Sequence, residues 1–275
     1  MKRLATAAVA VPLALAAVFR LPGPWFFLLC VVLVGWGALE YVRLLRSSLP
    51  GAPLWLVPLA APPVALLLVW ALDGGRQLES AGLWLVAAAV ALPLGVGAAV
   101  LFLRTPLDEV LGALGALAFG IPYFAVPIAS LYWLQQHDPW VVFLLCAIVW
   151  LGDTAALYAG TYLGRHRMAP VVSPKKTWEG AAAGLLIGVL ATAVWSVWRL
   201  GSLRWPLLAA GAGTAVAAQV GDLVESLIKR ASGAKDSGGI LPGHGGMLDR
   251  MDAMLFAAPA LLVGMWLIGV RVGSS

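Results

Sequence analysis

Charged residues are scarce in this chain. Only 11% of its 275 residues are Asp, Glu, Lys or Arg, whereas about a quarter of the residues of an average globular protein are charged. A soluble domain with so few charges could not cover its surface with polar groups, so the composition excludes one. Because 61% of the residues are hydrophobic, it also excludes a disordered chain, a collagen and a coiled coil.

Cysteine and histidine are also rare, with two and three residues respectively. Cys30 and Cys146 both lie within apolar runs, where a cysteine is typically a small buried residue rather than half of a disulfide. No cluster of cysteine and histidine is present, which argues against a zinc site. The net charge of +5 does not require a nucleic-acid partner, because membrane proteins accumulate Lys and Arg in their cytoplasmic loops.

Long apolar runs are abundant from end to end. A helix that spans the bilayer needs about 20 mostly apolar residues, and Pro, Gly or charged residues separate the runs. The sequence therefore predicts an all-α, polytopic integral membrane protein with about nine transmembrane helices. The predicted spans are 4–19, 25–40, 54–72, 82–103, 110–134, 140–160, 178–198, 205–228 and 252–270.

The distribution of Lys and Arg predicts the orientation of these spans. With the N-terminus in the cytoplasm, 13 of the 18 Lys and Arg residues fall in cytoplasmic loops, as the positive-inside rule requires. The loops 161–177 and 229–251 are then cytoplasmic, and we expect a plasma (inner) membrane protein whose active site faces the cytoplasm. A cleaved signal peptide is the alternative for the first span, but the next span follows at once, which favours a retained helix.

Ionisable residues divide the chain into two parts. Before Trp150 the acidic residues lie mostly in loops and at span ends, whereas several later ones lie within predicted spans, where a charge is costly and typically functional. We therefore expect residues 1–135 to form a membrane scaffold and residues 136–275 to form the catalytic part.

One polar stripe interrupts the eighth span. Residues at offsets of 3, 4, 7 and 8 share one face of an α-helix, and this spacing relates Asp222 to four later polar residues: Glu225, Ser226, Lys229 and Arg230. The stripe alone is equally compatible with an ion-paired seam between helices and with a functional site.

The segment after this stripe combines glycines, cations and carboxylates. Glycines allow backbone N–H groups to approach an anion, and Lys and Arg supply charge for phosphates. Asp249 and Asp252 lie three residues apart, so a helix that begins there presents both carboxylates on one side. Such hard oxygen ligands suit Mg²⁺ or Mn²⁺. A flexible linker is the alternative for the glycines alone.

Two further polar sites, the segment that begins at Ser173 and the residue Asp153, lie earlier in the chain than the polar stripe. Ser173 precedes Pro174, which predicts a helix N-cap followed by proline at the first helical position. An anion could bind at that helix start beside Lys175 and Lys176, although a well-capped span would show the same pattern. Asp153 is predicted within the sixth span, where it either lines a polar cavity that holds a metal or pairs with a basic residue.

Two segments resemble a known family. The run SLIKRASGAKDSGGILPGHGGMLDRMD at 226–252 closely resembles the C-terminal motif of the bacterial phosphatidate cytidylyltransferases (CDP-diacylglycerol synthases), and SPKKTWEG at 173–180 is similar to a second stretch of that family. The resemblance is strong over about residues 150–255. The family's pattern around Asp153 is only partly matched, because Tyr158 lies one place late and a basic residue is missing.

The resemblance implies an enzyme that converts CTP and phosphatidate into CDP-diacylglycerol and diphosphate. The lipid phosphate would attack the α-phosphate of CTP with help from Mg²⁺ or Mn²⁺. The partners would be CTP, phosphatidate and the lipid bilayer, with no nucleic acid, and small residues on the span faces permit a homodimer. The implied catalytic residues are Asp222, Asp249, Lys229, Arg230, Lys235 and Arg250; the implied substrate-binding residues are Ser173, Lys175, Lys176, Ser226, His244, Gly245 and Gly246; the implied metal ligands are Asp222, Asp249, Asp252, Asp236 and Asp153.

Two other classes of protein compete with this interpretation. A CTP-dependent polyprenol or lipid-alcohol kinase would share the nucleotide site but would need a base for a hydroxyl nucleophile. An ion-coupled transporter would use the intramembrane carboxylates as an ion path, but such folds often contain two related halves, and no internal repeat is visible.

Overall fold

The structure is a computed structural model that describes residues 2–74, 78–238 and 245–268. Within these residues the chain forms nine helices and one two-stranded antiparallel sheet. The helices are α1 (Lys2–Arg20), α2 (Gly23–Leu45), α3 (Leu56–Gly74), α4 (Leu78–Phe102), α5 (Val110–His137), α6 (Pro139–Tyr162), α7 (Trp178–Leu200), α8 (Trp205–Ala231) and α9 (Leu248–Leu267), and the strands are β1 (Arg167–Ala169) and β2 (Ser173–Thr177).

Six of these helices are long and apolar enough to cross a membrane. They are α2, α5, α6, α7, α8 and α9. In the other three helices, the apolar segments within the described residues are shorter: Val11–Arg20, Leu56–Leu72 and Val90–Phe102. The prediction of an all-α, polytopic membrane protein is therefore confirmed apart from the small sheet. Each predicted span overlaps one helix, but the count of nine spans is not confirmed.

The surface of the bundle is apolar, as a lipid-facing surface requires. Large side chains on the outside of the helices, among them Leu66, Leu94 and Val194, are more than half exposed. The backbone polar groups of these segments are satisfied inside each helix, which is the condition for crossing hydrocarbon.

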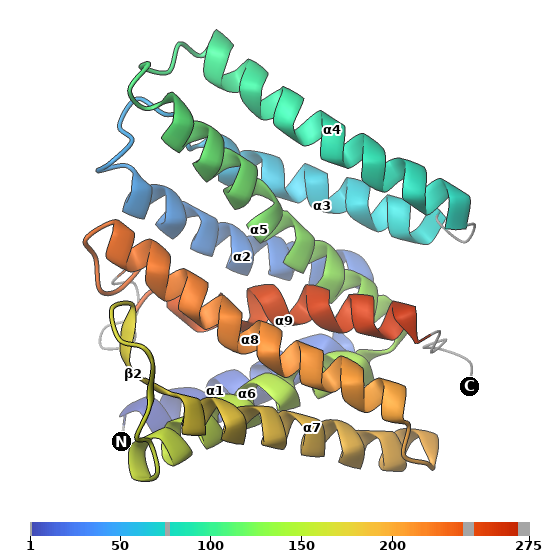
Figure 1. The fold of residues 1–275 in the computed structure, drawn as a ribbon. Coiled ribbons are helices and arrows are strands. Elements are labelled where there is room, and N and C mark those ends of the chain that lie inside the picture. Colours follow the sequence, from blue (N-terminus) through green and yellow to red (C-terminus); the bar gives the residue numbers. More distant parts are fainter. Residues whose placement is uncertain (1, 75–77, 239–244, 269–275) are drawn as a thin grey trace.

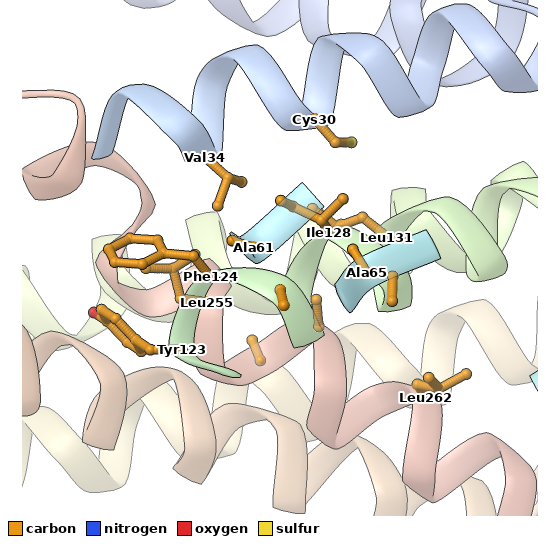
Figure 2. Close-up of a cluster of buried hydrophobic side chains, with 14 of the residues drawn as sticks. Cys30, Val34, Ala61, Ala65, Tyr123, Phe124, Ile128, Leu131, Leu255 and Leu262 are labelled. Carbon is orange, nitrogen blue, oxygen red and sulfur yellow. The ribbon is translucent and has the colours of Figure 1, made fainter. Parts of the chain in front are cut away.

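Helix α5 lies at the centre of the apolar core. Its Phe124 and Ile128 are fully buried and lie near Val34 of α2, Ala61 of α3 and Leu255 of α9 (Figure 2). The two cysteines, Cys30 and Cys146, are buried and free, which confirms that they are small core residues.

The connections that carry the polar residues lie at one end of the bundle. This end lies at the left in Figure 1. It contains the start of α1, the hairpin with β2, the C-terminal end of α8 and the start of α9. The connection between α7 and α8 lies at the opposite end. Helices α8 and α9 pack closely against each other, as do α6 and α7, and α2 contacts both α5 and α9. The fold therefore brings the polar segments of α2, β2, α8 and α9 to the same end.

Candidate active site

The segment 173–177 is an extended strand rather than the start of a helix. Strand β2 pairs with β1, with Arg167 opposite Thr177, and α7 begins only at Trp178. The cap of α7 is Thr177, whose hydroxyl accepts a hydrogen bond from the Gly180 amide at 3.2 Å. The prediction of Ser173 as the helix N-cap is wrong, because strand pairing holds this segment extended. An edge strand also tolerates the missing N–H of Pro174.

This strand directs Lys176 towards the helical bundle. The ammonium of Lys176 lies 2.6 Å from Oδ2 of Asp222 on α8. Lys175, whose side chain points to the other face of the strand, is exposed. The structure thus brings together Lys176 and Asp222, two predicted site residues that are distant in the sequence. It also shows that the neighbouring lysines differ, because Lys176 contacts the bundle and Lys175 is exposed.

Three carboxylates gather around this lysine, and we call them the outer carboxylate group: Asp153 of α6, Asp222 of α8 and Asp252 of α9. The charge of Asp222 acts on both Asp153 and Asp252, and Lys176 acts on both in the opposite sense. The group thus combines three carboxyl groups with one ammonium, which pairs with Asp222. It therefore offers more carboxyl oxygens than this lysine uses.

A second cluster lies around Lys229. Its ammonium is 2.5 Å from Oε2 of Glu225 and 2.5 Å from Oδ1 of Asp249. The other oxygen of Asp249 accepts hydrogen bonds from the Gly246 amide at 2.7 Å, the Ser237 amide at 3.1 Å and the Ser237 hydroxyl at 2.9 Å. In this arrangement both oxygens of Asp249 are used by the protein's own donors.

Glu40 of α2 completes this second cluster, although it was not among the predicted site residues. Its side chain is fully buried, and it accepts hydrogen bonds from the amides of Met247 and Leu248 at the start of α9. We call Glu40, Glu225 and Asp249 the inner carboxylate group. The available signal was a glutamate at the end of an otherwise apolar run.

The remaining predicted residues occupy varied positions. Arg230 donates to the carbonyl of Val172 at 3.3 Å and to that of Ala234 at 3.3 Å, and so ties the hairpin to the end of α8. His244 lies outside the described residues. Gly245 has a positive φ of 74°, a conformation that favours glycine. Of the others, Lys235, Asp236 and Arg250 are exposed, and Ser173 and Ser226 are half-buried.

Metal ligands were predicted at this end of the bundle, and the donor chemistry fits a hard divalent cation. The outer carboxylate group supplies carboxyl oxygens, the kind of ligand that Mg²⁺ and Mn²⁺ prefer. Among the described residues, however, no three His, Cys, Asp or Glu side chains are already arranged to hold a metal ion. Waters and substrate phosphates commonly complete such a shell, so the metal site and its ligands stay a prediction.

Taken together, the membrane-spanning helices and the ionisable residues at one end define a multi-pass helical membrane protein with a polar site at one end of its bundle. Over residues 1–268 the chain matches the model of the family described as the cytidylyltransferase family. The chain belongs to this family.

Several similar proteins carry the name phosphatidate cytidylyltransferase. The protein of Mycobacterium bovis is 36% identical over 152 residues, which cover 55% of this chain and 49% of that protein. The protein of Staphylococcus epidermidis is 42% identical over 139 residues, 50% of this chain and 54% of that protein. The protein of Bacillus subtilis is 44% identical over 129 residues, 46% of this chain and 48% of that protein. The chain thus matches about half the length of these curated relatives.

Proposed function

We propose that this chain is a phosphatidate cytidylyltransferase, which forms CDP-diacylglycerol and diphosphate from CTP and phosphatidate. The observation that carries the proposal is that the segment 173–180 contacts α8 through Lys176 and Asp222, four residues before the segment 226–252 begins, so that the two segments similar to the family's motifs lie at the same end of the bundle. The family to which the chain belongs and the names of its relatives support the same reaction.

The chemistry requires little from a general base. An oxygen of the lipid phosphate, which is already anionic, attacks the α-phosphorus of CTP. The new P–O bond forms as the bond from that phosphorus to the bridging oxygen breaks, and the electron pair leaves with diphosphate. The obstacle is the repulsion between two charged phosphates, so catalysis depends on positioning and charge neutralisation.

The residues of the chain supply both requirements. Lys175 and Lys235 are exposed cations at this end of the bundle, and we assign them to the phosphates of the substrates. Lys176 and Lys229, which are held by carboxylates, position the two carboxylate groups. Arg230 fixes the hairpin against α8, which keeps the two motif segments together.

A divalent cation fits this mechanism. We assign it to the outer carboxylate group, with Asp222 as the principal ligand. Asp249 stays a predicted ligand whose oxygens would have to exchange Lys229 or the amide donors for the metal. When bound, Mg²⁺ would neutralise phosphate charge and so favour the approach of the two substrates.

The site lies at the bundle end that carries most of the cations, so by the positive-inside rule we expect that end to face the cytoplasm. We propose accordingly that CTP arrives from the cytoplasm and phosphatidate from the bilayer. An inner (plasma) membrane location and a homodimer remain part of this proposal.

The test is an assay of the purified protein in detergent micelles with phosphatidate, Mg²⁺ and CTP labelled either in the cytidine or in the γ-phosphate. Incorporation of CMP into lipid supports the proposal. Transfer of the γ-phosphate to an added polyprenol would instead identify a lipid-alcohol kinase. Absence of turnover together with gradient-driven uptake in vesicles would identify a transporter.

A further inference from the structure

Helix α9 begins against a carboxylate from the opposite half of the chain. Oε1 of Glu40 accepts a hydrogen bond from the Met247 amide at 3.0 Å, and Oε2 accepts one from the Leu248 amide at 2.8 Å. Met247 precedes the helix without a side-chain cap of its own. A buried helix start needs partners for its first amides, and here Glu40 of α2 provides them.

Two glycines leave room for this carboxylate. A Cβ atom on Gly238 would lie only 2.6 Å from Oε1 of Glu40, and one on Gly246 would overlap both the Glu40 carboxylate and the Ser237 hydroxyl. At least part of the glycine-rich segment is thus folded around an internal anion.

The same contacts connect Glu40 to Asp249. The Ser237 hydroxyl lies 2.9 Å from Oε2 of Glu40 and 2.9 Å from Oδ2 of Asp249, and it can donate to one of them at a time. Asp249 in turn holds Lys229. A continuous series of contacts therefore leads from α2 to the ion pair between α8 and α9.

Burial makes this arrangement energetically demanding. Glu40 is completely inaccessible to solvent, and a buried carboxylate is unfavourable unless donors surround it. The two amides, the Ser237 hydroxyl and the positive end of the α9 dipole compensate it. Without this acceptor group the donors would lose their partner, and the start of α9 would lose its fixed position.

We propose that Glu40 is a positioning residue of the active site: its buried carboxylate fixes the start of α9 and thereby sets the direction of Asp249 and Lys229. The inference rests on the proposed cytidylyltransferase function. It assigns a role in that reaction to a helix of the part predicted to be scaffold, and Glu40 acts through its contacts with the α8–α9 segments rather than through contact with substrate.

The experiment combines amide hydrogen exchange and kinetics on the full-length protein in detergent. In Glu40→Gln we expect faster exchange at the amides of Met247 and Leu248, measured without substrate, because the amide oxygen is a weaker acceptor than the carboxylate. We expect kcat/KM for CTP to fall about 10–100-fold, the usual effect of losing a residue that orients ligands. Glu40→Asp, which keeps the charge on a shorter side chain, should retain part of both properties.

Tyr41→Phe is the matched control. Tyr41 is the next residue of α2, is also buried, and donates its hydroxyl to the carbonyl of Ala116 at 3.0 Å. This variant loses one buried hydrogen bond to α5, so we expect unchanged exchange at 247–248 and nearly wild-type kcat/KM. If Glu40→Gln does not fold, Ser237→Ala removes the hydroxyl between the two carboxylates and should raise the same exchange rates less strongly.

The outcomes separate this inference from the proposed function. Unchanged exchange at 247–248 in Glu40→Gln would overturn the anchoring role even if the wild-type protein turns over. Faster local exchange with unchanged kcat/KM would also overturn the positioning role. Absence of CMP transfer by the wild-type protein would refute the proposed function, whereas the exchange rates would still decide whether Glu40 fixes α9.

Discussion

The outer and inner carboxylate groups each combine three carboxyl groups with one lysine, but their surroundings differ. In the outer group (Asp153, Asp222 and Asp252) Asp222 pairs with Lys176, and in the inner group (Glu40, Glu225 and Asp249) Glu225 and Asp249 pair with Lys229. Within the described residues, Glu40 and Asp249 of the inner group accept hydrogen bonds from several backbone amides and from the Ser237 hydroxyl, whereas in the outer group Asp252 accepts one from the adjacent Ala253 amide. Glu40 and Glu225 are fully buried, whereas the side chain of Asp222 is 34% exposed.

This difference suggests that the two carboxylate groups have different roles. A carboxylate whose oxygens are already used by protein donors can fix the backbone but is poorly prepared to accept a further ligand. A more exposed carboxylate with like-charged neighbours gains from binding a cation. We therefore expect the outer group to act mainly on catalysis and the inner group to act on both catalysis and stability.

The largest expected effect is that of Asp222→Asn. Activity should fall by about 10³-fold, equivalent to about 4 kcal/mol of transition-state stabilisation, with little change in Tm because this side chain is partly exposed. The assay is CMP incorporation at saturating Mg²⁺, with thermal unfolding measured in parallel. Asp138→Asn at the opposite end of the bundle is the control. Turnover near the wild-type level in Asp222→Asn would exclude this residue as a principal metal ligand.

A smaller loss of activity, accompanied by a loss of stability, is expected for Asp249→Asn. The change leaves Lys229 without one of its two carboxylates, and breaking such a largely buried pair costs about 3 kcal/mol. Activity should fall by about 100-fold. Thermal or denaturant unfolding checks the stability. An unchanged Tm in Asp249→Asn would remove the distinction between the two groups.

Lys176→Met tests the charge balance of the outer group. Removing the ammonium 2.6 Å from Asp222 makes the surroundings of the carboxylates more negative. The affinity for Mg²⁺ or Mn²⁺ should rise about threefold to tenfold, while the KM for CTP rises as well. Titration of Mn²⁺ without substrate measures the first effect, and Lys176→Arg, which keeps the charge, is the control. Weaker cation binding in Lys176→Met would contradict a metal at the outer group.

The smallest effect is expected for Thr177→Val, which removes the cap of α7. Loss of the hydrogen bond from the Gly180 amide should lower stability by about 1 kcal/mol and leave turnover within a few-fold of the wild type. Thr161→Val is the matched control, because the Thr161 hydroxyl donates to the Leu157 carbonyl in its own helix. Equal shifts of Tm in the two variants would refute the capping role.

Local patterns were sufficient to predict the helices. Apolar run length and the breaks of Pro, Gly and charge placed a helix at each predicted span, and the polar stripe from Asp222 to Arg230 lies on α8 as expected. These features depend on residues that are neighbours in the sequence. The hairpin was missed because its strands are only three and five residues long and their pairing, rather than any alternation of apolar residues, holds them extended.

Contacts between distant residues could not be predicted in the same way. Nothing in the run around Glu40 indicates that its carboxylate meets Met247 and Leu248, because that contact depends on how α2 packs against α9. The occupation of both Asp249 oxygens likewise depends on contacts with Lys229, Ser237 and Gly246 that form only when the chain is folded. The division at residue 135 stays a prediction, although Glu40 belongs to the first part and contacts the second.

Arg199, near the end of α7, lies beside the rings of Trp140 and Trp198, the kind of aromatic cluster that marks a membrane–water interface. With a rise of 1.5 Å per residue, the helix separates this cluster from Trp178 by about 32 Å, which is about the thickness of the hydrocarbon layer. The proposed site therefore reaches a single leaflet. Under the proposed function, phosphatidate in the other leaflet would have to cross the bilayer before it could react, and CDP-diacylglycerol would be released on the side where it is formed.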